Sequence, residues 1–198
     1  VDGRLVKVDR RRSDQTHMCL GVPGLSLSHP DRYAFNLMNT ILGDGMSSRL
    51  FQRIREELAL AYVVQSFSQS HSDQGFFGVY AGVSPQRATS AVDAILNELR
   101  GFAETVTPAE LHRAREYLKG SLVLGTEDTR GVVSWIGRQE ALVGRIVTVT
   151  EALQYIDGVA LDDVCRVAER IFDPCNYRLA VLGPFECGDE FEAQLSAA

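Results

Sequence analysis

The sequence predicts an α+β fold in which a largely antiparallel sheet packs against helices. Two observations carry this prediction. Strand patterns occur in neighbouring pairs instead of alternating with helices, which favours antiparallel pairing over a doubly wound parallel sheet. Helical patterns with clear start signals follow, and no repeat, linker or low-complexity segment separates them. With 198 residues, of which 45% are hydrophobic, the chain is predicted to form one domain over residues 1–198.

The first elements are a strand, a helix and a strand pair. Residues 15–27 are apolar, with Gly and Pro interruptions, and suggest a first strand. Residues 30–42 carry apolar side chains at helical spacing, and Gly43-Asp44-Gly45 ends that helix. Further along, residues 62–70 alternate in polarity and residues 75–83 are rich in aromatic and β-branched side chains. These two segments are predicted to form an antiparallel pair.

Helices occupy most of the second half. Ser84-Pro85 places a serine cap before proline at the first helical position. Two capping boxes, at Thr107–Glu110 and Thr148–Glu151, start further helices. A last helix around residues 163–172 and a short strand over 177–182 complete the order. The helix after Ser84-Pro85 has an apolar stripe made of Ala88, Val92, Ile95, Leu99 and Phe102.

Composition excludes several classes of function. The net charge of -6, from 20 basic and 26 acidic residues, argues against nucleic acid as a partner. No run of predominantly apolar residues is long enough to span a bilayer, so no membrane partner is expected. The Cys and His residues show neither a C-x-x-C pair nor His pairs three or four residues apart, so we predict no metal site in this chain.

The expected location is a bacterial cytoplasm. Only two of the 20 basic residues are lysines, Lys7 and Lys119, and this arginine skew suggests a GC-rich bacterial genome. Cysteines without a disulfide framework suit a reducing compartment. The chain opens abruptly at Val1, which we interpret as a processed or cut start.

The stretch GMSSRLFQRIREELALAY, residues 45–62, begins as a helix and ends as a strand. Ser47 or Ser48 is expected to cap the helix. Arg53 has acidic residues three and four positions ahead and is expected to pair within the helix. On a wheel of about 100° per residue, one buried arc contains Leu50, Phe51, Ile54 and Leu58.

Arg55 and Tyr62 are the candidate binding residues of this stretch. Arg55 lies at the border of the apolar arc, and no acid stands three or four residues from it. It either meets a carboxylate from another element or serves a partner outside the chain. Tyr62 follows where helix gives way to strand, and it is either an ordinary strand residue or a hydroxyl donor. Together they offer donors that suit a peptide carbonyl or the oxyanion formed from it.

The blocks LGDGMSSRLFQRIREELALAY and DQGFFGVYAGVSP resemble the C-terminal half of pitrilysin and insulinase-type zinc metallopeptidases. The bacterial branch related to the mitochondrial processing peptidase is the most similar. The resemblance covers most of the chain and includes the Thr107-Pro108 helix start and the closing NYRLAVLGP. It implies the metallohydrolase-like half of the processing-peptidase fold.

The resemblance also implies a function. In this family zinc is held by H-x-x-E-H and a distal glutamate in the N-terminal half. The C-terminal half supplies an arginine and, seven residues later, a tyrosine that hold the substrate, and these match Arg55 and Tyr62. The chain is therefore expected to be the C-terminal, substrate-holding half of a two-domain zinc endopeptidase. Its expected partners are its own N-terminal half, a peptide substrate, and a homodimer mate or paired subunit.

Two departures from the family pattern limit this expectation. No H-x-x-E-H occurs in these residues, so the fragment alone is expected to be inactive. Ala59 stands where many relatives have glycine, and alanine favours continuing the helix. The alternative is a non-catalytic scaffold or partner subunit of the same fold. A free-standing peptide-binding module is a third reading, which requires Val1 to be near a native start.

Overall fold

A computed structural model describes residues 5–197 of the chain. Its strands form one five-stranded sheet in the order β1-β5-β2-β4-β3. β1 runs parallel to β5, and the other neighbouring strands are antiparallel. The predicted α+β fold with a largely antiparallel sheet is therefore confirmed. The strands are β1 (Val6–Arg10), β2 (Thr16–Gly24), β3 (Ala61–Ser70), β4 (Gly75–Val83) and β5 (Arg178–Gly183).

Helices connect these strands and account for most of the second half. The α-helices are α1 (Arg32–Gly43), α2 (Ala88–Thr105), α3 (Pro108–Gly125), α4 (Thr129–Val143), α5 (Val149–Asp157), α6 (Leu161–Ile171) and α7 (Asp189–Ser196). A π-helix, η1 (Phe51–Glu57), lies between α1 and β3. Two short 3-10 turns, η2 (Pro85–Arg87) and η3 (Pro174–Asn176), precede α2 and β5. Both predicted capping boxes are confirmed, at the starts of α3 and α5.

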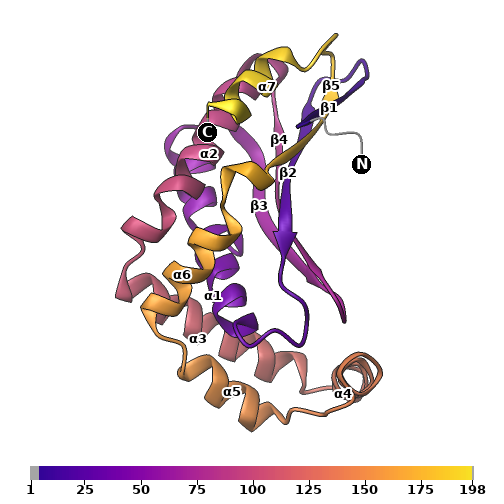
Figure 1. Ribbon diagram of the computed structural model, residues 1–198, viewed down its shortest axis with the longest axis vertical. Coiled ribbons are helices and arrows are strands. Elements are labelled where there is room, and N and C mark those ends of the chain that lie inside the picture. The colour runs from indigo at the N-terminus through magenta and orange to yellow at the C-terminus, as the bar shows by residue number, and fades with distance from the viewer. Residues whose placement is uncertain (1–4, 198) are drawn as a thin grey trace.

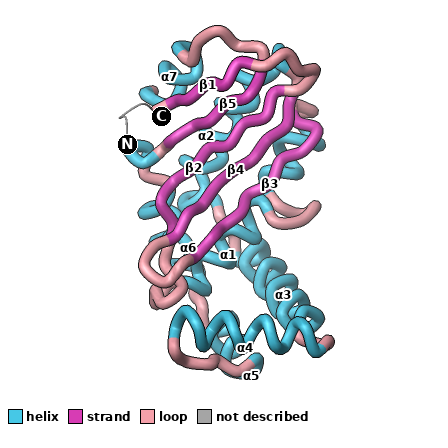
Figure 2. The backbone as a smooth tube through the Cα atoms, turned by 90° about the vertical axis from the view of Figure 1, so that its right-hand side faces the viewer, coloured by secondary structure: helices cyan, strands magenta, loops and turns pink. Residues whose placement is uncertain are grey.

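The helices cover one face of the sheet and leave the other open. Figure 1 shows α1, α2 and α6 packed along one side of the strands. Figure 2 looks onto the opposite face, and in the described part of the chain no helix lies over it. The helices α3, α4 and α5 extend beyond the end of the sheet that carries the β3–β4 turn (Figures 1 and 2). The sheet therefore has a helix-covered face and an open face.

Alternation along the strands decides which side chains reach the core. In β4, Phe77, Val79 and Ala81 are buried, whereas Phe76 and Tyr80 point to the open face and are more exposed. The predicted stripe of α2 is buried throughout, from Ala88 to Phe102. Each element thus presents its apolar side to one shared core.

Aromatic rings connect the sheet to the helices through that core. Phe77 of β4 lies 6.1 Å from Phe35 of α1 and 5.5 Å from Phe172 after α6, measured between ring centroids. Phe172 in turn meets Phe102 of α2 edge-on at 5.8 Å. Such tilted and edge-to-face pairs stabilise more than area burial alone. They hold the three covering helices against the middle of the sheet.

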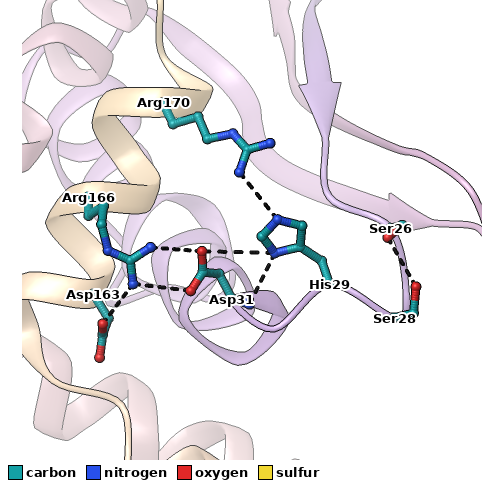
Figure 3. Close-up of polar contacts among 7 residues, drawn as sticks. All are labelled: Ser26, Ser28, His29, Asp31, Asp163, Arg166 and Arg170. Atoms are coloured by element: carbon teal, nitrogen blue, oxygen red, sulfur yellow. Dashed lines mark hydrogen bonds and ion pairs between the residues drawn. The ribbon is translucent and has the colours of Figure 1, made fainter.

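A cluster of polar side chains joins the start of α1 to α6 (Figure 3). Arg166 donates to both carboxylate oxygens of Asp31, at 2.8 and 3.1 Å, and also to Asp163 at 2.8 Å. The hydrogen bonds from Arg166 lower the pKa of Asp31. His29 accepts from the Asp31 backbone N–H through Nδ1, and its Nε2 lies 3.2 Å from Arg170. This cluster fixes two helices whose sequences are far apart.

Two elements lie outside the sequence-based predictions. No strand was expected before residue 15, yet β1 pairs with β5. No helix was expected after residue 172, yet α7 buries Phe191 and Leu195. β1 has five residues and depends on a partner strand far along the chain, and α7 has two turns and no side-chain cap. Short elements of this kind carry weak local sequence signals, and most of their stability comes from tertiary packing.

Candidate substrate-binding site

The segment between α1 and β3 contains an uncommon backbone conformation. Residues Phe51–Glu57 form a π-helix, in which an N–H bonds to the carbonyl five residues earlier. At its end, Leu58 N–H donates to Arg53 O at 3.0 Å, and Leu60 N–H donates to Ile54 O at 2.9 Å. π-Helical turns are rare and occur frequently at functional sites.

The π-helix changes which side chains are buried. Leu50 and Ile54 have no exposed surface, as the wheel predicts, but Leu58 is 39% exposed. The expected burial of Leu58 is wrong because a wider turn rotates less per residue than the α-helical wheel assumes. The expected serine cap is also wrong, because Ser48 Oγ donates back to Gly45 O at 2.7 Å. No side-chain cap bond precedes η1.

Two arginines of η1 have different surroundings. Arg53 donates to Glu57 at 2.6 Å, so its predicted pairing within the helix is confirmed. Arg55 keeps 43% of its side chain exposed, and its Cζ lies 4.8 Å from the centre of the Phe51 ring. Its Nε lies 3.8 Å from the carboxylate of Glu56, the next residue in the chain, which is not one of the positions three or four residues away. That distance is too long for a hydrogen bond, and the Arg55 guanidinium forms no hydrogen bond to another side chain or carbonyl within residues 5–197.

Tyr62 lies at a bulge in β3. Ala61 pairs with Val83 and Val63 pairs with Gly82, so Tyr62 is an extra residue on its strand. A bulge re-aims the side chain that it carries and often lies beside an active site. Tyr62 is 61% exposed, and its hydroxyl has no hydrogen-bond partner within residues 5–197.

Ala59 forms the corner between η1 and β3. Its φ is 48°, in the left-handed region, so the helix ends before it and does not continue as alanine's propensity suggests. The guanidinium of Arg87, in η2, donates to the Ala59 carbonyl. Sequence reasoning missed Arg87, because only folding brings η2 beside this corner. Arg87 thus positions the turn that leads into Tyr62.

Replacing Ala59 with glycine is expected to stabilise the protein by about 0.5–1 kcal/mol. Glycine adopts positive φ without the cost of about 1 kcal/mol or more that an alanine Cβ incurs, although its freer unfolded chain offsets part of the gain. Urea denaturation measures the change. Ala94→Gly in α2 is the matched control and is expected to destabilise by about 1 kcal/mol. A destabilised Ala59→Gly variant would contradict the left-handed corner.

An ion pair anchors the start of this segment. Arg49 donates through Nε to Glu110 Oε1 at 2.6 Å and through a second nitrogen to Oε2 at 2.9 Å. Its Cζ also lies 5.0 Å from the Phe102 ring centre. Burial alone would raise the pKa of Glu110, but hydrogen bonds from Arg49 and Thr107 lower it to about 2. The segment is thereby tied to the α2–α3 corner.

The chemistry of the site is that of hydrogen-bond donation without an intrinsic catalyst. Arg55 offers a planar set of charged donors and Tyr62 a neutral hydroxyl, both exposed and both on backbone irregularities. Residues 5–197 hold no group of three or more His, Cys, Asp or Glu side chains that could bind a metal ion. None of the helices described is both long and apolar enough to cross a bilayer.

Comparison with known proteins decides the family. The model of the family described as "Peptidase M16 inactive domain" matches residues 2–118. The chain belongs to this family. The family predicted from the two sequence blocks is therefore confirmed.

Several curated relatives of this M16 chain come from bacteria. One, named an uncharacterized zinc protease, comes from Streptomyces coelicolor and is 40% identical over 91% of the chain and 39% of its own length. Another, the uncharacterized zinc protease YmxG of Bacillus subtilis, is 34% identical over 88% of the chain and 43% of its own length. The chain thus spans about two fifths of the length of these relatives.

Solved structures share the fold. A protease from Helicobacter pylori superposes with a TM-score of 0.83 at 21% identity, over 90% of this chain and 44% of that chain. A peptidase M16 inactive domain from Pseudomonas fluorescens gives a TM-score of 0.83 at 20% identity, over 91% of this chain and 43% of that chain. A chain of Complex III2 from Candida albicans gives a TM-score of 0.82 at 20% identity, over 96% of this chain and 49% of that chain.

Proposed function

We propose that this M16 chain is the substrate-holding C-terminal half of a two-domain, zinc-dependent endopeptidase that hydrolyses peptides or unfolded segments. The observation that supports it most is the succession of three backbone irregularities within twelve residues. A π-helix carries Arg55, a left-handed corner follows at Ala59, and a bulge carries Tyr62. Irregular backbone persists where the surrounding structure maintains it, and it gathers at binding and catalytic sites.

In this proposal Arg55 and Tyr62 bind the substrate backbone. The Arg55 guanidinium donates to a carbonyl oxygen of the peptide, and the Tyr62 hydroxyl donates to the same or a neighbouring carbonyl. Charge that develops on that oxygen during hydrolysis strengthens both bonds. The described residues do not fit a zinc site, so the metal belongs to the part of the protein outside this chain, and no catalytic step is assigned to these residues.

The protein's partners and location follow from the same proposed function. The N-terminal half of the same polypeptide would complete the site, and a second copy or a paired subunit would be a further partner. The relatives' greater length and bacterial origin support a longer bacterial protein. We place it in the cytoplasm because its cysteines form no disulfide framework, and we expect no nucleic-acid partner because the chain is acidic overall and no membrane partner because it has no long apolar run. Cell fractionation tests that location.

The first test is cleavage of an unfolded peptide by the intact natural polypeptide that contains this segment. Cleavage should disappear with a chelator and return with zinc. Residues 1–198 alone should not cleave the same peptide. A folded intact protein that contains no zinc and cleaves nothing would overturn the proposal.

A non-catalytic scaffold of the same fold is the second candidate. The family description names an inactive domain, and a chain of Complex III2 has the same fold, which together favour this candidate. A degenerate H-x-x-E-H upstream and a zinc-free purified protein would support the scaffold. Co-purification of a stoichiometric partner subunit would then identify its function.

A further inference from the structure

A second polar pair lies on the open face of the sheet, near Tyr62. His17 of β2 and Tyr80 of β4 place Nδ1 and the phenol oxygen 2.7 Å apart. Their rings stack with centroids 6.0 Å apart and an interplanar angle of 21°. Both side chains are half-buried, so each retains surface toward solvent. Within residues 5–197, the other ring nitrogen of His17 has no hydrogen-bond partner.

A glycine keeps the space beside this pair free of a side chain. A Cβ built on Gly82 would lie 3.7 Å from Tyr80 Oη, 3.8 Å from His17 Nδ1 and 3.8 Å from Gln15 Oε1. Three polar atoms therefore converge around one point of the open face. We call His17, Tyr80 and Gln15 the polar niche.

His17 of the polar niche and Tyr62 lie on the two strands that flank β4 on opposite sides. Gly82 pairs with His17 on one side and with Val63, the residue after Tyr62, on the other. Neighbouring strands are about 4.8 Å apart, so β2 and β3 are separated by about 10 Å. An extended peptide advances about 3.3 Å per residue, and about three residues cover this distance.

The hydrogen-bonding capacity of the pair matches a peptide unit. When Tyr80 donates its O–H to Nδ1, His17 presents an Nε2–H donor and the phenol oxygen accepts. When Nδ1 carries the proton instead, the phenol O–H is free to donate and Nε2 accepts. In either arrangement the pair offers one donor and one acceptor, as a peptide unit requires. The outward residues beside it, Cys19 and Gln65, carry no formal charge.

We propose that the polar niche is a second backbone-binding subsite for an extended peptide, about three residues away from the carbonyl held by Tyr62. This inference rests on the proposed function of Arg55 and Tyr62. It assigns the site a preference for peptides long enough to reach both positions. His17 and Tyr80 are binding residues in it, and neither takes part in bond cleavage.

The test uses the intact protein and nested peptides shortened from either end. Tyr80→Phe and His17→Phe should each raise KM for the longest peptide about fivefold, with little change in kcat, because each loses about one hydrogen bond to substrate. His17→Gln should restore most of the loss, since its amide can present a donor near the position of Nε2. Some of the peptides are shortened, at the end that reaches the niche, to within two residues of the cleaved bond. For these peptides the KM of each variant should equal that of the unmodified protein.

Controls separate this inference from the proposed function. Tyr155→Phe, on exposed α5, should leave KM unchanged, whereas Tyr62→Phe should lower turnover at every peptide length. An unchanged KM in the niche variants, or an equal loss on short peptides, would overturn the niche while Tyr62 sensitivity remains. If the intact protein cleaves nothing, the niche is tested by binding instead: fluorescence anisotropy measures the affinity of each variant for a labelled unfolded peptide in the presence of a chelator. About fivefold weaker binding by Tyr80→Phe is then expected, and equal binding would overturn the niche.

Discussion

Replacing Arg55 with alanine in the intact protein is expected to lower kcat/KM for peptide hydrolysis about 100-fold. Loss of a preorganised donor to a developing oxyanion costs about 10²–10³ in rate. The kcat/KM of Arg55→Lys should lie between that of Arg55→Ala and that of the unmodified protein, because lysine keeps the charge and loses the planar pair of donors. Tyr62→Phe should lower turnover about tenfold or more, since it removes one neutral donor and keeps the ring.

Arg53 provides the matched control for Arg55. It lies two residues earlier in the same π-helix, is similarly exposed, and is paired with Glu57. Arg53→Ala should leave kcat/KM within about twofold and change stability by about 0.5 kcal/mol or less. Steady-state kinetics on one unfolded peptide compares the variants, with circular dichroism to confirm folding. Equal activity of Arg55→Ala and Arg53→Ala would remove Arg55 from the site.

Replacing Arg49 with alanine is expected to destabilise the protein by about 3 kcal/mol. Arg49 holds Glu110 through two charged hydrogen bonds and also donates to the Thr105 carbonyl at 2.8 Å. Only 14% of the Arg49 side chain and 16% of the Glu110 side chain are exposed, so either residue alone would be a largely buried, unpaired charge. Urea denaturation measures the loss, and Arg53→Ala serves again as the exposed control. A loss under 1 kcal/mol would show that this pair does not anchor the segment.

The same pair makes stability depend on pH in a defined window. The pKa of Glu110 is lowered from 4.5 to about 2, so the folded protein favours its charged form. This stabilisation is fully present above about pH 4.5 and is lost as the pH falls toward 2. The shift corresponds to about 3 kcal/mol, which the solvent screening that remains at this largely buried pair reduces to about 1–2 kcal/mol.

Glu110→Gln should therefore destabilise by about 1–2 kcal/mol at pH 7 and by progressively less below pH 4.5. Urea denaturation at pH 7, 5 and 3 measures the difference from the unmodified protein. Glu151→Gln, in the capping box of α5, is the matched control. It should lower the free energy of unfolding by less than Glu110→Gln does, because the Glu151 carboxylate is more exposed. A difference that stays constant between pH 7 and pH 3 would contradict the lowered pKa of Glu110.

Elements with strong local signals could be predicted from the sequence. The helix α2 follows from its apolar stripe, and α3 and α5 follow from capping boxes whose bonds all lie within four residues. The β3–β4 pair follows from two strand patterns joined by a short turn. In each case the residues that determine the element are neighbours in the chain, so pattern and propensity act in the same direction.

Elements that depend on distant partners could not be predicted. β1 has its strand conformation because β5 pairs with it, and their sequences are more than 160 residues apart. The wheel placed Leu58 inside, because nothing in FQRIREEL distinguishes a π-helix from an α-helix. Alanine at position 59 locally favours a continued helix, yet the residue adopts a left-handed conformation where Arg87 binds its carbonyl and β3 begins to pair with β4.

The sequence by itself determined the class of fold and the family, and it singled out two candidate donors, because residue types and their spacing carry that information. Arg55 and Tyr62 were identifiable as a forked cation and a phenol seven residues apart. Only the tertiary structure decided in which direction the side chains of Arg55 and Tyr62 point. The anchor from Arg49 to Glu110 and the bond from Arg87 hold the two ends of a backbone that no local preference would maintain, and the bulge turns Tyr62 outward. Those contacts join segments far apart in the chain, so they exist only after folding.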